Sequence, residues 1–260
     1  MKIQKWIGLL LVAALAVSLF AGCAKPAQVP INSPEDLNEK RIGVQEGTTG
    51  DTYVTDNVTD AAISRFKKPT DAALDLKNAK LDAVVLDEMP AKKIVEKNPD
   101  LKILEFNLTN EDYAIAIAKG NDEKLAQINK TMQRIKEDGT YDKLIDKYMN
   151  NEDVELPEIP DYTSNGTLIM GTNAEFEPFE FRDDANNIVG FDVEIAKQIA
   201  YDMGLELKIE DMAFDSLTMA LASGKVDIVI AGMTADDERR KEVDFSEPYY
   251  NASQVIIVRK

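Results

Sequence analysis

Two stretches of this chain, residues 76–87 and 221–232, share one pattern, and this repetition constrains the fold more than any other feature. Each begins with the end of a helix, continues through a tight turn, and finishes in a short run of apolar, mostly β-branched residues. Such runs are typical of strands buried in a mostly parallel sheet. Elsewhere short β-branched runs alternate with helix-period stretches, as in strands joined by crossover helices. The sequence therefore predicts two similar α/β lobes, each a mixed, mostly parallel sheet flanked by helices.

A polar linker over residues 150–166 divides these elements into two segments. It contains Pro157 and Pro160 and ends in Ser164-Asn165-Gly166, a composition that favours irregular structure. Before the linker we expect strands at 41–44, 81–86 and 113–118 and helices at about 123–138 and 140–149. After it we expect strands at 168–170 and 205–209 and helices at 193–203 and about 214–223.

The N-terminus has the layout of a secretory signal peptide. Two lysines precede an apolar run over residues 7–20, which is shorter than the roughly 20 residues that span a bilayer. Leu19-Phe20-Ala21-Gly22-Cys23 resembles a bacterial lipobox, which implies cleavage after residues 1–22, acylation of Cys23, and a lipid-anchored tether over 23–31. Ordinary secretion with an incidental cysteine is the alternative. Cys23 is the only cysteine, so no intrachain disulfide forms.

Charge and composition exclude several function classes. The chain has 260 residues and a formal net charge of −17, which disfavours nucleic acids and anionic membrane surfaces as partners. It contains no histidine, which excludes Ser-His-Asp and Cys-His catalysis and histidine metal ligands. We expect no cofactor and no metal site.

Groups able to hold a free amino acid follow several of the predicted strands. A bound amino acid needs a cation for its carboxylate, an anion for its ammonium and directed donors. Arg239 can fork two N–H groups onto a carboxylate beside Thr234, and Asp87 directly follows an apolar strand. The glycine-bounded turn over 46–51 opens a helix whose N–H groups suit an anion. Taken singly, each has a structural explanation, such as a solvated helix face for Arg239 and a helix cap for Asp87.

Together these motifs resemble the polar amino acid-binding proteins that feed ABC importers. Residues 171–181, 188–196 and 231–250 resemble the larger lobe of that family, and residues 33–51 and 82–87 resemble the smaller lobe. The resemblance implies a two-lobed type II periplasmic-binding-protein-like fold with the ligand between the lobes. The implied ligand-binding residues are Arg239, Thr234 and Thr48 for the carboxylate, Asp87 and the Gly232 carbonyl for the ammonium, and Asn173, Phe176, Phe214 and Gln45 for the side chain. Thr49, next to Thr48, is also expected to bind the ligand.

The resemblance leaves the ligand open. Many members of the family have aspartate at the position of Asn173, where it faces the basic group of lysine or arginine. Glu175 or Glu180 is a possible substitute, so arginine, glutamine and other polar side chains all remain candidates.

The order of the motifs differs from that of the family. The smaller lobe (32–107) comes first, followed by a hinge strand and returning helices of the larger lobe (108–150), the linker (151–166) and the main part of the larger lobe (167–260). This is the order of a circular permutant. We expect the permutation to sever one of two interlobe strands and hinge closure to survive on the crossing near 107–112.

The function implied is that of a monomeric, non-catalytic, lipid-anchored extracytoplasmic protein that delivers a polar amino acid to an ABC transporter permease. One alternative is an enzyme similar to cyclohexadienyl dehydratases, with Glu175 as the placed acid. Another is a ligand-sensing coreceptor whose partner is a separate chain.

Overall fold

The computed structural model describes residues 30–104, 106–160 and 164–260. The predicted signal peptide, the lipobox, Cys23 and most of the tether lie outside the described residues. Ile31–Lys260 form one compact unit. Within the described residues no helix is both long and apolar enough to span a bilayer.

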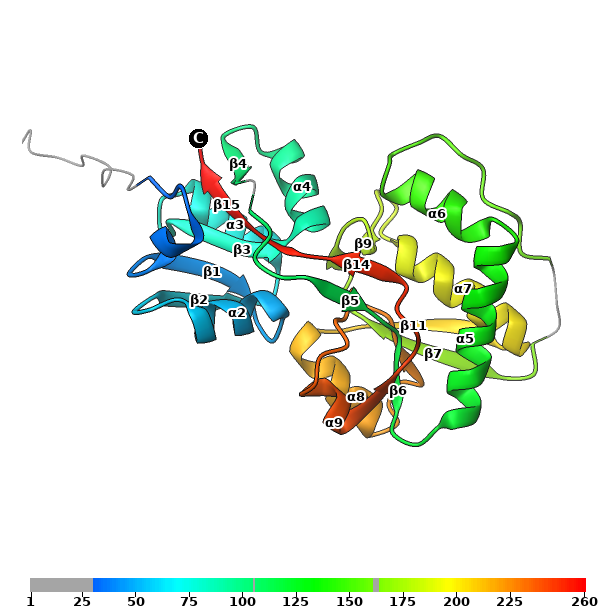
Figure 1. The fold of residues 1–260 in the computed structure, drawn as a ribbon. Helices are drawn as coiled ribbons and strands as arrows, with labels where there is room; N and C mark the ends of the chain where they lie inside the picture. The colour runs from blue at the N-terminus through cyan, green and yellow to red at the C-terminus, as the bar shows by residue number, and fades with distance from the viewer. Residues whose placement is uncertain (1–29, 105, 161–163) are drawn as a thin grey trace, which may run out of the picture. The chain divides into compact units, whose positions relative to one another are not determined.

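The smaller lobe is built on a five-stranded sheet in the order β2-β1-β3-β15-β4, in which β15 runs antiparallel to the other four strands (Figure 1). Its middle strand is buried on both faces: Val85 packs toward one cluster of the core and Val84 and Leu86 toward another. Its strands are β1 (Arg41–Gln45), β2 (Ala62–Phe66), β3 (Ala83–Asp87), β4 (Leu101–Leu104) and β15 (Gln254–Arg259), and its helices are η2 (Pro34–Leu37), α2 (Thr49–Asn57), α3 (Pro69–Lys77) and α4 (Glu88–Lys97).

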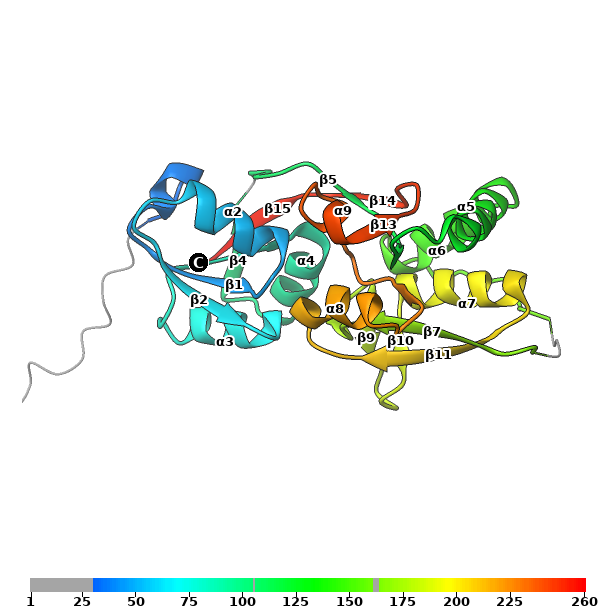
Figure 2. The same ribbon diagram turned by 90° about the horizontal axis from the view of Figure 1, so that it is seen from below.

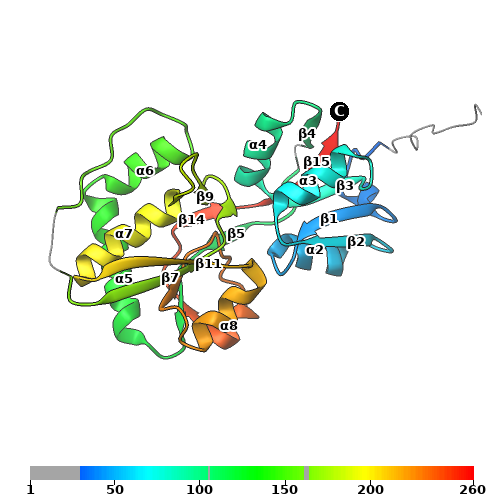
Figure 3. The same ribbon diagram turned by 180° about the vertical axis from the view of Figure 1, so that it is seen from behind.

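The larger lobe is built on a second five-stranded sheet, in the order β11-β7-β12-β6-β13, in which β6 runs antiparallel to the other four strands. β7 and β11 lie side by side in Figure 3. The strands of this sheet are β6 (Ala116–Ala118), β7 (Thr167–Thr172), β11 (Glu206–Asp211), β12 (Ile228–Val229) and β13 (Val243–Phe245). The helices are α5 (Asp122–Glu137), α6 (Thr140–Tyr148), α7 (Phe191–Met203), η3 (Phe214–Ser216), α8 (Leu217–Ala222) and α9 (Arg239–Glu242). A small antiparallel sheet adds β8 (Glu175–Phe176), β9 (Glu180–Arg182) and β10 (Ile188–Val189).

The predicted repetition is confirmed. The two repeated stretches end in β3 and β12, and each of these strands is the middle strand of its five-stranded sheet. In both sheets the fourth strand is the antiparallel one. The two lobes therefore share one strand arrangement, and the mixed, mostly parallel α/β fold predicted from the sequence is present.

Two strands carry the chain between the lobes, side by side (Figures 1 and 2). β5 (Glu111–Tyr113) pairs antiparallel with β14 (Tyr250–Ala252). β5 leads into β6 of the larger lobe, and β14 leads into β15 of the smaller lobe. We expected one interlobe strand to be severed, and this expectation is wrong, because both crossings are continuous.

The boundary of the larger lobe also needs correction. We assigned all of 167–260 to that lobe, but β15 pairs with β3 and β4 of the smaller lobe. Its apolar residues Val255, Ile256 and Ile257 are at most 2% exposed. Because β15 lies inside the sheet and its apolar residues are buried, it belongs to the smaller lobe.

The structure also corrects two smaller predictions, the extent of the tether and the continuity of the strand over 113–118. Ile31, assigned to the tether, is 6% exposed and packs in the core of the smaller lobe. The strand expected over 113–118 is split into β5 and β6, because Ala114 N–H donates to the Met233 carbonyl and Ile115 N–H to Ser246 Oγ. Ala114 and Ile115 thus bond to groups outside the strands that pair with β5 and β6, and the regular strand is interrupted between β5 and β6.

Candidate ligand site

The predicted ligand groups lie where the strands of both lobes end. Thr48 and Thr49 follow β1, and Asp87 is the last residue of β3. In the larger lobe, Thr234 follows β12 and Arg239 begins α9. Open α/β sheets bind ligands beyond the carboxyl ends of their strands, so this placement agrees with a ligand site.

Arg239 connects the two lobes. Its Nη1 donates to the Thr234 carbonyl at 2.8 Å, and its Nη2 donates to the Gly47 carbonyl of the smaller lobe at 3.0 Å. The guanidinium carbon lies 5.3 Å from the centre of the Phe214 ring. Only 13% of the side chain is exposed, so Arg239 is not on the solvated helix face that its charged sequence context favours. Burial lowers its pKa, and the negative charge of Asp236 opposes this shift.

The two neighbouring threonines of the smaller lobe have different roles. Thr48 is the N-cap of α2, and its hydroxyl donates to the Gln45 carbonyl at 2.8 Å. The Thr49 hydroxyl instead lies 3.1 Å from the Thr234 hydroxyl of the larger lobe. Thr49, rather than Thr48, therefore presents its side chain to Thr234.

Asp87 is buried at the boundary between the lobes. It is 4% exposed, and one carboxylate oxygen accepts a hydrogen bond from the Tyr113 hydroxyl. Burial, together with the nearby charge of Glu111, raises the pKa of Asp87 to about 7. A cavity of about 10 Å³ lined by Asp87, Tyr113 and Tyr250 has about the volume that one water molecule requires.

Sequence reasoning missed Glu111, the first residue of β5. Its side chain is 4% exposed, and Oε2 accepts hydrogen bonds from Thr49 Oγ1 at 2.7 Å and Thr234 Oγ1 at 2.6 Å. An acid in the polar stretch 109–112 is typical of a solvated loop, so nothing local in the sequence marks it. Only the pairing of β5 with β14 carries it to the site.

Two residues predicted to line the side-chain pocket, Gln45 and Asn173, are hydrogen-bonded to each other through their amide groups. Gln45 Nε2 donates to Asn173 Oδ1 at 2.8 Å, and Asn173 Nδ2 donates to the Met212 carbonyl at 2.8 Å. Gln45 Oε1 is buried without a hydrogen-bond partner among the described residues. Asn173 therefore joins the lobes through Gln45, and a buried acceptor is left beside this pair.

The two aromatic residues predicted to line the side-chain pocket, Phe176 and Phe214, contact different partners. Phe176 is 5% exposed and stacks on Phe179, with ring centres 5.8 Å apart. A Cβ on Gly232, whose φ is +52°, would lie only 2.7 Å from the Phe176 ring. Glycine is therefore required at this position by the close approach of the ring. Phe214 packs against Arg239 instead.

Glu175 and Glu180 are the candidates to replace the aspartate that many family members have at the position of Asn173. Glu175 is paired with a lysine, and Glu180 is buried. Glu175 forms an ion pair with Lys68 of the smaller lobe. Glu180 is fully buried, and burial with the nearby charge of Asp192 raises its pKa well above the usual range. Glu175, the placed acid of the dehydratase-like alternative, is thus paired with a lysine of the other lobe.

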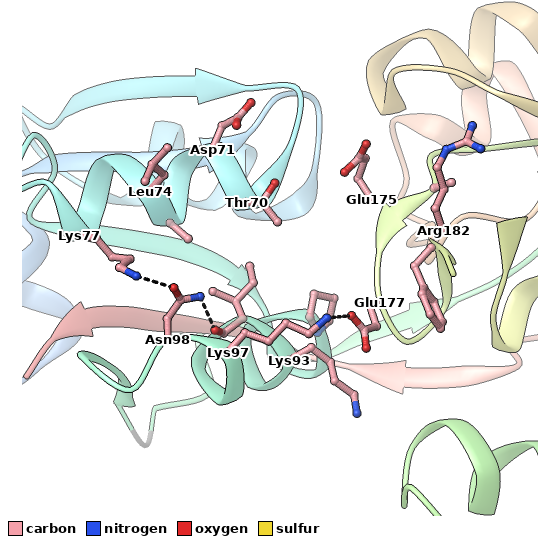
Figure 4. A pocket seen from close by; sticks show the side chains of 15 residues that line it. Thr70, Asp71, Leu74, Lys77, Lys93, Lys97, Asn98, Glu175, Glu177 and Arg182 are labelled. Atoms are coloured by element: carbon pink, nitrogen blue, oxygen red, sulfur yellow. Dashed lines mark hydrogen bonds and ion pairs between the residues drawn. The ribbon is translucent and has the colours of Figure 1, made fainter. Parts of the chain in front are cut away.

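A larger cavity of about 530 Å³ lies between α3 and α4 of the smaller lobe and the β8–β9 region of the larger lobe (Figure 4). Glu175 is the predicted site residue that lines it. The Lys97–Glu177 ion pair joins the lobes at this cavity. The described residues contain no group of three or more metal-ligating side chains that could hold a metal ion.

Two similar α/β lobes, with candidate ligand groups from both, define a two-lobed binding protein. The chain matches the family model of the bacterial extracellular solute-binding proteins, family 3, over residues 26–151 and 168–260. The match covers well over half of the chain, and the protein belongs to this family.

Individual relatives match over shorter segments. The arginine-binding extracellular protein ArtP of Bacillus subtilis (strain 168) is 52% identical over 93 residues, which are 36% of each chain. The L-cystine-binding protein TcyJ of Escherichia coli (strain K12) is 37% identical over 95 residues, again 36% of each chain. These matches span about a third of the length of the curated relatives. Among solved structures, the arginine-bound form of domain 1 from TmArgBP is 48% identical, over 36% of this chain and 81% of that one, with a TM-score of 0.33.

Proposed function

We propose that this protein binds a polar amino acid between its two lobes and delivers it to an ABC importer, without catalysis. Family membership and the names of the relatives support this proposal. The observation that carries it is the convergence of the lobes on one point. Arg239 of the larger lobe donates to Gly47 of the smaller lobe, beside the contact between Thr49 and Thr234.

For the ligand itself, we propose arginine or glutamine. Both carry side-chain N–H donors, and Gln45 Oε1 is a buried acceptor without a partner among the described residues. A buried acceptor left unpaired is unfavourable, so a donor from the ligand would stabilise the complex. The neighbouring Asn173 amide carries no charge, so it offers no ion pair to the guanidinium of arginine.

A thermal-shift screen of the twenty amino acids, followed by calorimetry on the hits, tests this proposal. A ligand at 100 times its dissociation constant stabilises the folded protein by about 2.7 kcal/mol. We expect arginine or glutamine to raise the melting temperature and agmatine, which lacks the carboxylate, to have little effect. A protein that no amino acid stabilises would refute amino acid binding.

We also propose that Cys23 anchors a monomeric protein outside the cytoplasm through a lipid. The lipobox-like sequence over 19–23 and the extracellular description of the family support this proposal. Expression in a bacterial host should yield a membrane-associated protein whose N-terminal peptide carries acyl chains in mass spectrometry. A Cys23→Ala variant should lose the acyl chains and leave the membrane fraction.

The order of the segments supports a further proposal, that the chain is a circular permutant of its family. Both lobes keep complete five-stranded sheets although the smaller-lobe strands β1 to β4 precede the larger-lobe strand β7. A chain rebuilt with 167–260 ahead of 31–150 should bind the same amino acid with an affinity within about threefold, which is under 1 kcal/mol. Loss of binding on reordering would contradict the proposal.

A further inference from the structure

Glu111 links the two lobes at the candidate site through a single carboxylate oxygen. Thr49 belongs to the first turn of α2 in the smaller lobe, and Thr234 follows β12 in the larger lobe. Both hydroxyls lie within 2.7 Å of Glu111 Oε2. The acid itself stands on β5, one of the two strands that connect the lobes.

The direction of these hydrogen bonds follows from the chemistry of the partners. A carboxylate offers only acceptors, whereas a hydroxyl has one proton and two lone pairs. Thr49 and Thr234 therefore both direct their protons at Glu111. Each hydroxyl is left with lone pairs, so it can accept a hydrogen bond from a ligand but has no proton to donate to one.

Thr109 holds the other oxygen of the same carboxylate. Its hydroxyl accepts from the Gln254 backbone N–H at 2.9 Å and donates to Glu111 Oε1 at 2.5 Å. A backbone N–H can only donate, so the direction of this chain of bonds is set by the polypeptide itself. The orientation of Glu111 is thereby fixed from the side away from Thr49 and Thr234.

We propose that Glu111 is a positioning residue that makes the hydroxyls of Thr49 and Thr234 acceptors for the ammonium group of the ligand. The ligand carboxylate is then left to Arg239 and to backbone N–H groups, in place of the Thr234 hydroxyl contact that the family resemblance implies. This inference rests on the proposed function. The negative charges of Glu111 and Asp87 lie close enough to influence each other, which suits a site for a cation.

The test compares an amino acid with its analogue that lacks the ammonium. L-Arginine is paired with 5-guanidinopentanoic acid, or L-glutamine with glutaric acid monoamide if the screen selects glutamine. Glu111→Gln keeps the shape of the side chain but adds an N–H donor that turns one hydroxyl away. Loss of one hydrogen bond to a charged group weakens binding by about tenfold or more. We expect that loss for the amino acid and less than about a twofold change for the analogue, measured by calorimetry or by competition.

A mutant cycle provides a second readout that does not depend on the analogue. Thr234→Val removes one hydroxyl, so the penalty of Glu111→Gln for the amino acid should shrink in that background. Thr234→Ser keeps the hydroxyl and should retain the full penalty. Glu88 follows Asp87 in the sequence and pairs with Lys92, so Glu88→Gln serves as the control for lost charge near the site.

Three outcomes would overturn the inference. An equal loss of affinity for the amino acid and its analogue would show a purely structural role for Glu111. A gain in affinity in Glu111→Gln would show that its carboxylate competes with the ligand. An unchanged penalty in Thr234→Val would show that Glu111 does not act through that hydroxyl. A wild-type protein that binds no amino acid refutes the proposed function first, before any variant is compared.

Discussion

At the scale of single residues, the candidate site combines a buried cation with two buried acids. Arg239 is held by backbone carbonyls from both lobes. Asp87 accepts a hydrogen bond from the Tyr113 hydroxyl, and Glu111 accepts hydrogen bonds from the hydroxyls of Thr49 and Thr234. Neither acid has an ion pair within 4.0 Å among the described residues. Such acids are costly to bury, and a ligand ammonium would compensate this cost.

Replacement of Asp87 by alanine tests this compensation. The variant should bind the amino acid ligand about 2–5 kcal/mol more weakly, the range for removal of one partner from a buried charge pair. Calorimetry on the ligand chosen by the screen measures the change. Glu88→Gln removes an acid from the next position and should leave affinity nearly unchanged. A loss of less than about fivefold in Asp87→Ala, or about 1 kcal/mol, would argue against an ammonium contact.

The pH dependence of binding follows from the same residue. Without ligand the pKa of Asp87 is raised to about 7, mainly by burial. A ligand ammonium favours the ionised form, so the pKa falls on binding, and below pH 7 the carboxyl must release a proton to bind. Affinity should therefore rise from pH 5 to pH 7, by up to about tenfold per pH unit, and level off above pH 8. Asp87→Asn should bind weakly with no such slope, and a flat profile in the wild type would contradict the assignment.

At the scale of elements, helix α7 depends on a backbone geometry that only glycine tolerates. Gly190, its N-cap, has φ +134°, and a Cβ there would lie 2.2 Å from the Phe179 carbonyl oxygen. The first turn of α7 carries Asp192, which accepts hydrogen bonds from Gly232 N–H and the Tyr249 hydroxyl. The start of α7 thus positions the backbone segment that precedes Thr234.

Alanine at position 190 should therefore lower the free energy of unfolding by about 3 kcal/mol or more, from backbone strain and overlap combined. Gly224 also has a positive φ, +72°, but a Cβ there would meet nothing within 4 Å. Gly224→Ala should cost only about 1–2 kcal/mol, the strain of a left-handed residue. Urea unfolding of both variants gives the comparison, and equal costs would show that the contact with Phe179 does not matter.

At the scale of the whole molecule, three lysines of the smaller lobe pair with acids of the larger lobe. Lys67 pairs with Asp215, Lys68 with Glu175 and Lys97 with Glu177. The lysine side chains are 51–66% exposed, so each pair contributes at most about 1 kcal/mol and is screened by salt. These pairs favour contact between the lobes weakly, and a bound ligand would have to supply most of the stability of a closed state.

Small-angle scattering tests closure directly. The radius of gyration should fall when the ligand-free protein is saturated with its amino acid, because both crossings between the lobes are continuous and can act as a hinge. The double variant Lys68→Gln/Lys97→Gln should have a larger ligand-free radius than the wild type. Lys80→Gln, which breaks a pair with Asp75 inside the smaller lobe, should not. A radius that does not change with ligand would refute closure.

The sequence by itself determined the two α/β lobes, the linker between the segments and the strand ends at which Thr49, Asp87, Thr234 and Arg239 stand. Those features depend on local periodicity and on short motifs, which the chain carries wherever it folds. The tertiary structure decided which sheet takes β15, how often the chain crosses between the lobes, and that Glu111 reaches the site. Strand partners and the burial of a charged side chain depend on contacts between residues far apart in sequence. Such contacts have no signature in the local sequence pattern.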